Sequence, residues 1–392
     1  MYDLKALLIG CQGTGTPRAA VRGELEKLSI DVEAEVSDVD ACLAFVAARP
    51  SESRILVVHS GRNSPPDAVE RLLASATGRP ILVLFDPGYE PVLPARRPSL
   101  ETIELPFRPD DLRSAIHRFE IQSPQAASRC RTILVLGATE GVGCTSVAAN
   151  LASELGRLEK GPCILAEQAV AFGRLANYLG IRPKVTLYDL VIDLDHMEAR
   201  MPEAMAQFED NLYVLVGSYR EITPFMITPE VAFKALACAM QLATTVVVDA
   251  RHHFEEVDLD FAAKSQHVVL VAKPTIPSLH SMRTLLEALL RRGSQGKHYV
   301  VINQYVASLD AISRQTIEGH LNEHEVFLVA SDPAMAAVES SGRLLRKSAP
   351  DSEALRDITT LAHSILGTPP EQPARHTLRE SLKRVAQSLN LG

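Results

Sequence analysis

The chain has 392 residues, 46% of them hydrophobic, which is enough for two or three domains with buried cores. Its formal net charge is −8 and it has no long run of Lys or Arg, which argues against a dedicated nucleic-acid-binding protein. No apolar run approaches the roughly 20 residues that a membrane-spanning helix needs, and the first residues do not resemble a signal peptide. Six scattered cysteines without a CxxC pair indicate reduced thiols in a cytoplasmic protein.

Residues 1–120 alternate short apolar runs with amphipathic segments. The predicted strands cover residues 5–9, 32–36, 55–58, 81–85 and 102–105. The predicted helices cover residues 18–28, 39–48, 68–74 and 110–119. This alternation predicts a doubly wound α/β domain with a parallel sheet. Residues 121–130 are polar and contain Pro124, so we interpret them as a linker.

Residues 131–367 repeat the alternation and predict a second, mostly parallel sheet with helices on both faces. The predicted strands cover residues 132–136, 163–166, 212–216, 245–249, 267–272, 299–303 and 326–329. The predicted helices include one that begins at Cys144, and others at 185–191, 229–242 and 281–291. Ligands of such sheets bind outside the carboxyl ends of the strands. Residues 368–392 form a Pro-containing break and a terminal tail.

A glycine-rich turn joins the first strand and the first helix of this second domain. Gly141 and Gly143 allow positive φ and a close approach of the backbone to a phosphate. The helix that follows adds unpaired N–H groups and the positive end of its dipole. Thr145 or Ser146 could place a hydroxyl on a magnesium ion, whereas Cys144 stands where phosphate-binding loops carry a lysine. A plain tight turn is the alternative interpretation.

Asp249 follows three consecutive valines at the end of a predicted buried strand. Phosphate-loop proteins hold the metal and its water shell with an aspartate at this place. The loop and Asp249 agree in order and spacing, so Thr145 and Asp249 are the candidate ligands of a magnesium ion. An aspartate that only caps a turn is the alternative.

The ordered set of motifs resembles the deviant-Walker ATPases related to MinD and ParA. More narrowly, it resembles the TadZ/CpaE proteins of the Tad (Flp) pilus-assembly system, and the resemblance covers nearly the whole chain. That family joins an atypical receiver-like domain to a MinD-like domain. The matching stretches are GATEGVGCTSVAANLA (137–152), AVAFGRLANYLG (169–180), TTVVVDARHHF (244–254), VVLVAKPTIPSLHSMR (268–283), VVINQY (300–305) and ASDPAMAAVESSGRLL (330–345).

The resemblance implies an ATP site with magnesium at the carboxyl edge of the second sheet. Asp249 would be the Walker B acid, and Asn303 would contact the adenine. The cofactor-binding residues implied are Gly141, Val142, Gly143, Cys144, Thr145, Ser146, Asp249 and Asn303.

The sequence departs from the family's pattern where the family carries charge. The signature lysine falls at Thr139, the loop's usual glycine is Glu140, and the Walker lysine is Cys144. The acidic pair after the next strand is reduced to Glu167 and Ala169, and position 169 is the one that helps to activate water. Because one cationic contact in phosphoryl transfer is worth ~10³-fold or more, these losses argue against ATP hydrolysis and assign no catalytic residue.

The first domain resembles a receiver domain, including Leu105-Pro106-Phe107 at its last β–α turn, but it lacks the receiver's chemistry. His59 stands at the phosphorylation site, and Leu105 replaces the lysine. The residues in place of the acidic pair are Gly10, Cys11 and Gln12. We therefore expect an interaction or dimerisation module rather than a phosphorylated switch.

Three further features have open interpretations. Cys144 is either a reactive thiol at a helix N-terminus or a small residue that fills the place of the lysine. The pairs His252-His253 and His320/His324 are either metal ligands or solvated surface. The tail at 374–392 carries an apolar stripe flanked by basic residues, and it could bind an anionic membrane, a partner or its own domain.

The leading hypothesis is a non-catalytic or nucleotide-binding scaffold of a Tad-type pilus or secretion apparatus. It would form a homodimer through the MinD-like domain and bind other Tad components, including the secretion ATPase, without binding nucleic acid. Its expected location is the cytoplasm, at the inner membrane or cell pole, with peripheral membrane contact. The alternatives are a weak ATPase whose dimerisation is controlled by ATP, and a pseudo-receiver signalling regulator.

Overall fold

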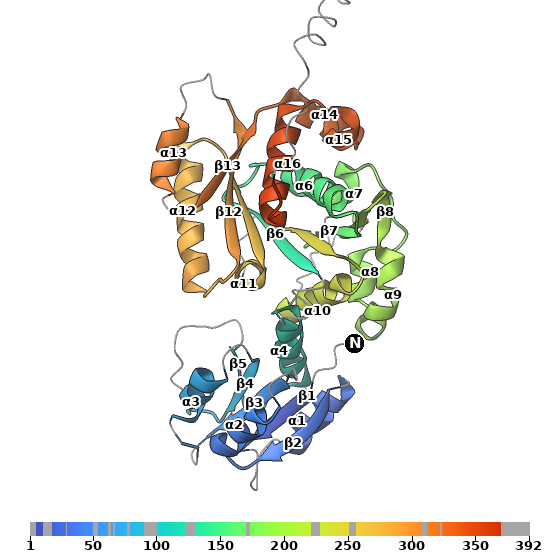
Figure 1. The fold of residues 1–392 in the computed structure, drawn as a ribbon. Helices are drawn as coiled ribbons and strands as arrows, with labels where there is room; N and C mark the ends of the chain where they lie inside the picture. Colours follow the sequence, from blue (N-terminus) through green and yellow to red (C-terminus); the bar gives the residue numbers. More distant parts are fainter. Residues whose placement is uncertain are drawn as a thin grey trace, which may run out of the picture.

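The structure is a computed structural model, shown in Figure 1, and its described residues form two parallel-sheet units. This arrangement confirms the predicted α/β class with two doubly wound sheets. The tail at 374–392 and most of the linker at 121–130 lie outside the described residues. Those described are 5–10, 18–28, 30–49, 54–61, 64–65, 67–76, 79–89, 100–122, 130–169, 173–220, 228–250, 256–306, 312–321 and 324–369.

The first sheet has five parallel strands in the order β2-β1-β3-β4-β5, which is the flavodoxin-like order. Its strands are β1 (Lys5–Ile9), β2 (Asp31–Val36), β3 (Arg54–Ser60), β4 (Ile81–Phe85) and β5 (Leu100–Glu104). Helices α1 (Arg18–Lys27) and α4 (Pro109–Gln122) bury apolar side chains on one face. Helices α2 (Val39–Ala47) and α3 (Ala68–Ser75) cover the other face. Alternate residues of the strands point to the two faces, as the pleat requires.

The second sheet has eight strands in the order β13-β12-β11-β6-β10-β7-β9-β8. Its strands are β6 (Arg131–Gly137), β7 (Cys163–Glu167), β8 (Ala206–Glu209), β9 (Leu212–Leu215), β10 (Thr245–Asp249), β11 (His267–Ala272), β12 (Lys297–Tyr305) and β13 (Glu325–Ala330). All neighbours pair in parallel except β8 and β9. Strand β6 lies between β10 and β11, so the loop after β6 opens at the middle of the sheet's carboxyl edge.

Helices cover both faces of the second sheet and give it two separate apolar cores. One face carries α8 (Leu187–Val191), α9 (Met197–Ala204), α10 (Pro229–Met240), α11 (Glu256–Lys264), α12 (Ile276–Arg291) and α13 (Arg314–His320). The other face carries α6 (Cys144–Glu159), α7 (Leu175–Tyr178), α14 (Pro333–Ser341), α15 (Leu345–Ser348) and α16 (Glu353–Leu366). No helix among the described residues is long and apolar enough to cross a membrane.

The structure differs from the predicted elements at a few boundaries. Helix α12 begins at Ile276, earlier than the predicted residue 281, because Pro277 occupies its first turn, where a missing N–H costs nothing. Strand β8 was not predicted, since the sequence of this four-residue antiparallel edge strand lacks a clear apolar alternation. Helix α4 extends to Gln122, two residues into the predicted linker.

The two units touch through α4, which packs against α10 of the second unit (Figure 1). An ionic contact accompanies this packing: the Glu101 carboxylate accepts a hydrogen bond from Lys264 and pairs with Arg118 at 3.0 Å. Glu101 belongs to the first unit and Lys264 to the second, so the ion pair joins the two units directly.

Candidate functional site

The glycine-rich loop after β6 adopts the left-handed backbone that its sequence predicts. Gly141 has φ +66° and Gly143, which caps α6, has φ +91°, a region that residues with a side chain rarely adopt. The helix then begins at Cys144, and Gly143 accepts its first hydrogen bond, from the Val147 amide at 3.0 Å. The loop therefore presents its backbone to the carboxyl edge of the sheet, as an anion-binding turn requires.

Thr145 and Asp249 meet at this edge. The Thr145 hydroxyl donates to Asp249 Oδ2 at 2.7 Å, because β10 lies next to β6 in the sheet. Asp249 is buried, and its second oxygen, Oδ1, has no hydrogen-bond partner among the described residues. Burial raises the pKa of Asp249 to about 7, the Thr145 hydroxyl opposes this rise, and the charge of Glu167 adds to it.

The hydroxyl of Thr145 and the carboxyl of Asp249 form a donor set that fits a magnesium ion. Both are hard oxygen ligands, which Mg²⁺ prefers, and a buried carboxylate oxygen without a partner can complete its bonding on a cation. The structure thus brings together the two residues that were predicted as metal ligands. Their role in metal binding stays a prediction.

Cys144 begins α6, and its side chain packs against Gly137. Its Sγ packs so closely over Gly137 that a Cβ built on that glycine would lie 2.7 Å away. Burial raises the pKa of the Cys144 thiol well above its usual value, and the nearby Asp249 carboxylate raises it further. A raised pKa disfavours the thiolate, which argues against the reactive-thiol interpretation.

Asn303 supports the loop from the end of β12. Its buried side chain donates from Nδ2 to the carbonyl of Val142 at 2.8 Å. Val142 is itself buried in the core beneath the loop. Asn303 thus holds the loop's backbone through a contact that sequence reasoning did not foresee, and its predicted contact with adenine stays a prediction.

Replacing Gly143 with alanine should destabilise the protein by about 2 kcal/mol. The left-handed backbone costs a residue with a side chain about 1 kcal/mol, and the new Cβ would lie 2.4 Å from Asn303 Nδ2. Moving Asn303 would break its bond to Val142, at a cost of about 1 kcal/mol.

The matched control for this variant is Gly141→Ala. Gly141 also has a left-handed backbone, with φ +66°, but a Cβ added there would have no neighbouring atom within 4 Å. Gly141→Ala should cost about 1 kcal/mol for the backbone alone. Denaturant unfolding of both variants measures the difference, and equal losses would show that the Asn303 contact is unimportant.

Glu167 has a structural role at the end of β7. Its Oε1 accepts hydrogen bonds from the backbone amides of Arg174 at 2.6 Å and Leu175 at 3.2 Å. Its Oε2 accepts from the amide of Gly217 at 3.0 Å. The carboxylate therefore holds α7 and the segment after β9 at the sheet's edge. Ala169, at the position where the resemblance predicted an acid, has an apolar side chain that cannot activate water.

These residues line one cleft of about 1060 Å³. The loop residues 139–146 form its floor, and the segments after β7, β10, β12 and β13 form its walls. Sequence reasoning did not assign several other lining residues to the site, although all of them except Tyr219 lie in the stretches that carry the resemblance. They are Arg174, Asn177, Tyr178, Tyr219, Gln304, Ser331, Asp332, Met335 and Ala336.

The remaining predicted residues lie at the margin of this cleft or outside it. Thr139 and the exposed Glu140 line the cleft, and the Thr139 hydroxyl lies 3.4 Å from that of Ser278 on α12. Ser146 also lines it, from the first turn of α6. The pair His252-His253 lies outside the described residues, within which no cluster of three metal-ligating side chains occurs.

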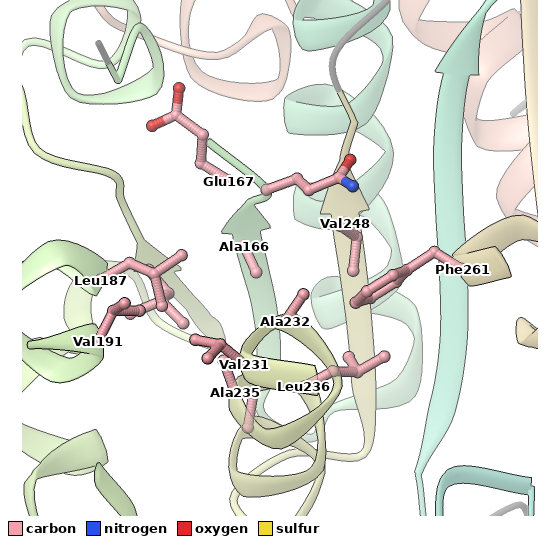
Figure 2. Close-up of a pocket in the computed structure, with 13 residues that line it drawn as sticks. Ala166, Glu167, Leu187, Val191, Val231, Ala232, Ala235, Leu236, Val248 and Phe261 are labelled. Carbon is pink, nitrogen blue, oxygen red and sulfur yellow. The ribbon is translucent and has the colours of Figure 1, made fainter. Parts of the chain in front are cut away.

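A second cavity of about 30 Å³ lies behind the cleft, beneath α10 (Figure 2). Aliphatic side chains from α8 and α10 and the ring of Phe261 surround it, with Glu167 at one end. Gln168 also lines it. This volume has room for one or two water molecules, so it is a packing defect of the core rather than a ligand site.

Comparisons with known proteins bear on the fold. No protein-family model matches the chain, and no curated protein matches it. The MinD septum site-determining protein of Pyrococcus horikoshii, solved with Mg-ADP, is 19% identical with a TM-score of 0.50, over 60% of this chain and 96% of that one. The ParA family ATPase of Chlorobium tepidum is 20% identical with a TM-score of 0.53, over 59% and 97%. MinD in the MinC:MinD complex of Aquifex aeolicus is 17% identical with a TM-score of 0.51, over 62% and 98%.

Likeness at these identities shows a shared fold. About 60% of this chain aligns with nearly the whole length of each of these structures. That share is close in length to the second unit. The chain therefore contains the fold of the MinD- and ParA-type P-loop ATPases.

Proposed function

We propose that the chain is a nucleotide-binding localisation protein whose cleft holds the phosphates of ATP or ADP together with magnesium. The observation that carries this proposal is the pair Thr145 and Asp249, 2.7 Å apart beside an open glycine loop. The partnerless Oδ1 of Asp249 supports it, because such an oxygen is costly to bury without a ligand. The similar MinD of Pyrococcus horikoshii was solved with Mg-ADP.

In this proposal the site binds a nucleotide without turning it over. Thr145 and Asp249 would hold the metal, which when bound supplies charge neutralisation to the phosphates. Cys144 is an uncharged thiol in place of the lysine. The Glu167 carboxylate is held by three backbone amides, so it is poorly placed to take a proton from water.

Titration of the full chain with ATP and with ADP, each with and without Mg²⁺, tests this proposal. We expect binding that requires Mg²⁺, with no phosphate release above that of a buffer control. Asp249→Ala should weaken the Mg²⁺-dependent binding by about ten- to a hundredfold, the value of a hydrogen bond to a charged group. Absence of nucleotide binding would contradict the nucleotide-binding function, and turnover abolished by Asp249→Ala would favour the weak-ATPase alternative.

We further propose that this protein is a scaffold of a Tad-type pilus or secretion apparatus. It would act as a homodimer through the MinD-like unit, in the cytoplasm at the inner membrane or cell pole, and bind Tad components such as the secretion ATPase. The ordered motifs and the pairing of two α/β units support this role. The similar MinD of Aquifex aeolicus was solved in complex with MinC, a precedent for partner binding by this fold.

Two measurements test the scaffold role. Sedimentation with and without Mg-ATP should show a dimer, and a strain that lacks the gene should lose Tad pili while keeping the secretion ATPase. Pili at normal levels in that strain would reject the assignment to a Tad apparatus. A monomer under both conditions would reject the dimer.

A further inference from the structure

The cleft has an unusual balance of charge for a site that binds phosphates. Among its described lining residues, the carboxylates are Glu140, Glu167, Asp249 and Asp332. Arg174 is the one cationic side chain in that set. A triphosphate brings three to four more negative charges, and one magnesium ion offsets only two of them. A cationic side chain in direct contact with the phosphates would therefore contribute strongly to binding.

The backbone of Arg174 is held at the carboxyl edge of the second sheet. Its backbone amide donates to Glu167 Oε1 at 2.6 Å, which fixes its Cα beside the carboxyl end of β7. Glu167 is in register with Asp249 on the neighbouring strand β10. The preceding residue is also held, because the Gly173 amide donates to the Ser218 carbonyl at 2.9 Å.

The Arg174 side chain itself is available to a ligand. It is exposed, lines the cleft, and forms no ion pair recorded among the described residues. A guanidinium with this position and freedom can turn its planar N–H groups toward a bound phosphate.

We propose that Arg174 is the phosphate-binding cation of this cleft and supplies in cis the charge that is absent at Thr139 and Cys144. This inference rests on the proposed nucleotide site. In it, Arg174 is the residue that attracts the negatively charged phosphates to the cleft. Arginine suits the place because its fork can form two parallel hydrogen bonds with one phosphate group.

The test measures the affinity of the full chain for Mg-ATP, Mg-ADP and magnesium pyrophosphate in the wild type, Arg174→Ala and Arg174→Lys. Loss of the contact should weaken binding of the nucleotides about ten- to a hundredfold in the alanine variant, and less in the lysine variant. Parallel losses for pyrophosphate would place the contact on the phosphates. An unchanged pyrophosphate affinity beside weakened nucleotide binding would overturn the phosphate contact.

Arg220→Ala is the matched control. Arg220 is also exposed and lies next to the cleft-lining Tyr219, but its guanidinium donates to the Tyr219 hydroxyl at 2.9 Å and does not line the cleft. Its removal takes the same charge from the same region, so we expect less than about a threefold loss, as for a screened surface charge. Equal losses in Arg220→Ala and Arg174→Ala would mean that only the general field matters and would overturn the inference.

Two results separate this inference from the proposed function. If the wild type binds no nucleotide, both fail. If the wild type binds Mg-ATP and Arg174→Ala binds it equally well, the nucleotide site stands and the role of Arg174 is wrong.

Discussion

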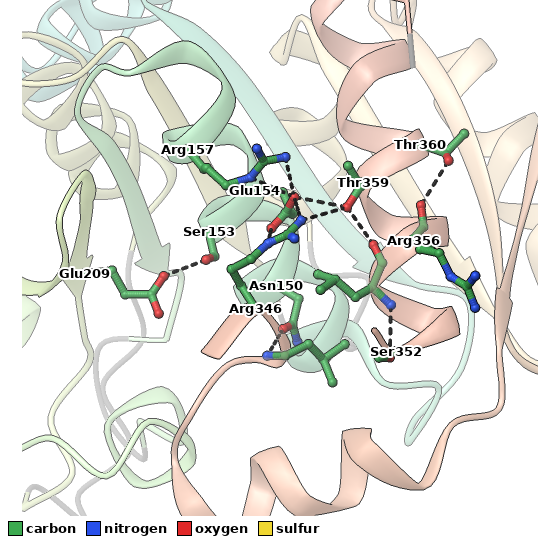
Figure 3. A network of polar contacts seen from close by, with 12 residues as sticks. Asn150, Ser153, Glu154, Arg157, Glu209, Arg346, Ser352, Arg356, Thr359 and Thr360 are labelled. Carbon is green, nitrogen blue, oxygen red and sulfur yellow. Dashed lines mark hydrogen bonds and ion pairs between the residues drawn. The ribbon is translucent and has the colours of Figure 1, made fainter. Parts of the chain in front are cut away.

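Arg346→Met is expected to lower the free energy of unfolding by about 3 kcal/mol at neutral pH. The reason is Glu154 on α6, whose side chain is fully buried. Arg346 on α15 binds this carboxylate with two hydrogen bonds, of 2.7 and 2.5 Å (Figure 3). Arg157 and Thr359 each bind it at 3.0 Å. Removal of Arg346 takes away the strongest partner and leaves a buried charge incompletely compensated.

The stability lost in Arg346→Met should depend on pH. Burial pushes the pKa of Glu154 upward, but the hydrogen bonds and charge of Arg346, with help from Arg157, bring the pKa below its usual value. A carboxyl with a lowered folded-state pKa stabilises the fold above its unfolded-state pKa, and this contribution is lost as the pH falls through the folded-state pKa. The difference between wild type and Arg346→Met should therefore be largest at pH 7 and shrink below about pH 4.

Two further variants identify the cause. In Glu154→Met/Arg346→Met both charges are gone and apolar groups fill their volume, so we expect at least half of the lost stability to return. Arg356→Met removes an exposed arginine from the adjacent helix α16 and should change stability by less than about 0.5 kcal/mol. Denaturant unfolding at pH 7 and at about pH 3 supplies all the values. A double variant less stable than Arg346→Met would contradict this explanation.

This network also connects the cleft to the end of the described chain. Helix α6 begins at the glycine loop and carries Glu154, while Asn150 one turn earlier accepts a hydrogen bond from the Leu345 amide at 2.9 Å (Figure 3). Asp332, which lines the cleft, accepts from the Ser352 hydroxyl at 2.6 Å. The loop helix and the C-terminal helices are thus fastened to each other by buried polar contacts as well as by apolar packing.

Local sequence pattern was sufficient for the strands other than β8 and for the placement of the loop. Runs of valine, leucine and isoleucine are typical of strands buried on both faces, and Gly141 and Gly143 stand where the turn needs left-handed backbone. The meeting of Thr145 and Asp249 was predictable too. Both follow parallel strands, whose carboxyl ends share one edge of the sheet.

Contacts between distant segments were not predictable in this way. Arg346 and Glu154 are 192 residues apart, and Asn303 is 161 residues from Val142. Neither pair carries a local pattern, because the contacts depend on how α15 and β12 pack in three dimensions. Arg174 was hidden for a related reason: only the assembled cleft shows that its other charged lining residues are acids.

Asp249→Asn is expected to raise the free energy of unfolding at pH 8, in the absence of divalent cations, by on the order of 4 kcal/mol. Burial is the main reason that the pKa of Asp249 rises from 3.8 to about 7, and each pKa unit corresponds to about 1.4 kcal/mol. Asparagine avoids the buried charge, and its side-chain oxygen can still accept the Thr145 hydrogen bond.

The stability difference between Asp249→Asn and the wild type should depend on pH. Between about pH 4 and pH 7 the folded protein binds more protons at Asp249 than the unfolded chain does, so the contribution of Asp249 to stability falls as the pH rises. The advantage of Asp249→Asn should be absent at pH 4, grow through that window and level off above pH 7. Denaturant unfolding at a series of pH values measures it, and an equal advantage at pH 4 and pH 8 would exclude the carboxylate as its source.

Magnesium should narrow the difference in stability between the two proteins. A cation on Oδ1 of Asp249 supplies the partner that the folded chain lacks there, so Mg²⁺ should stabilise the wild type at pH 8 and have little effect on Asp249→Asn. Stabilisation should weaken below pH 7, where protons compete with the metal for the carboxylate. Equal effects of Mg²⁺ on both proteins would place the metal elsewhere. The instability that Asp249 introduces without a ligand is thus the property that would make the fold responsive to one.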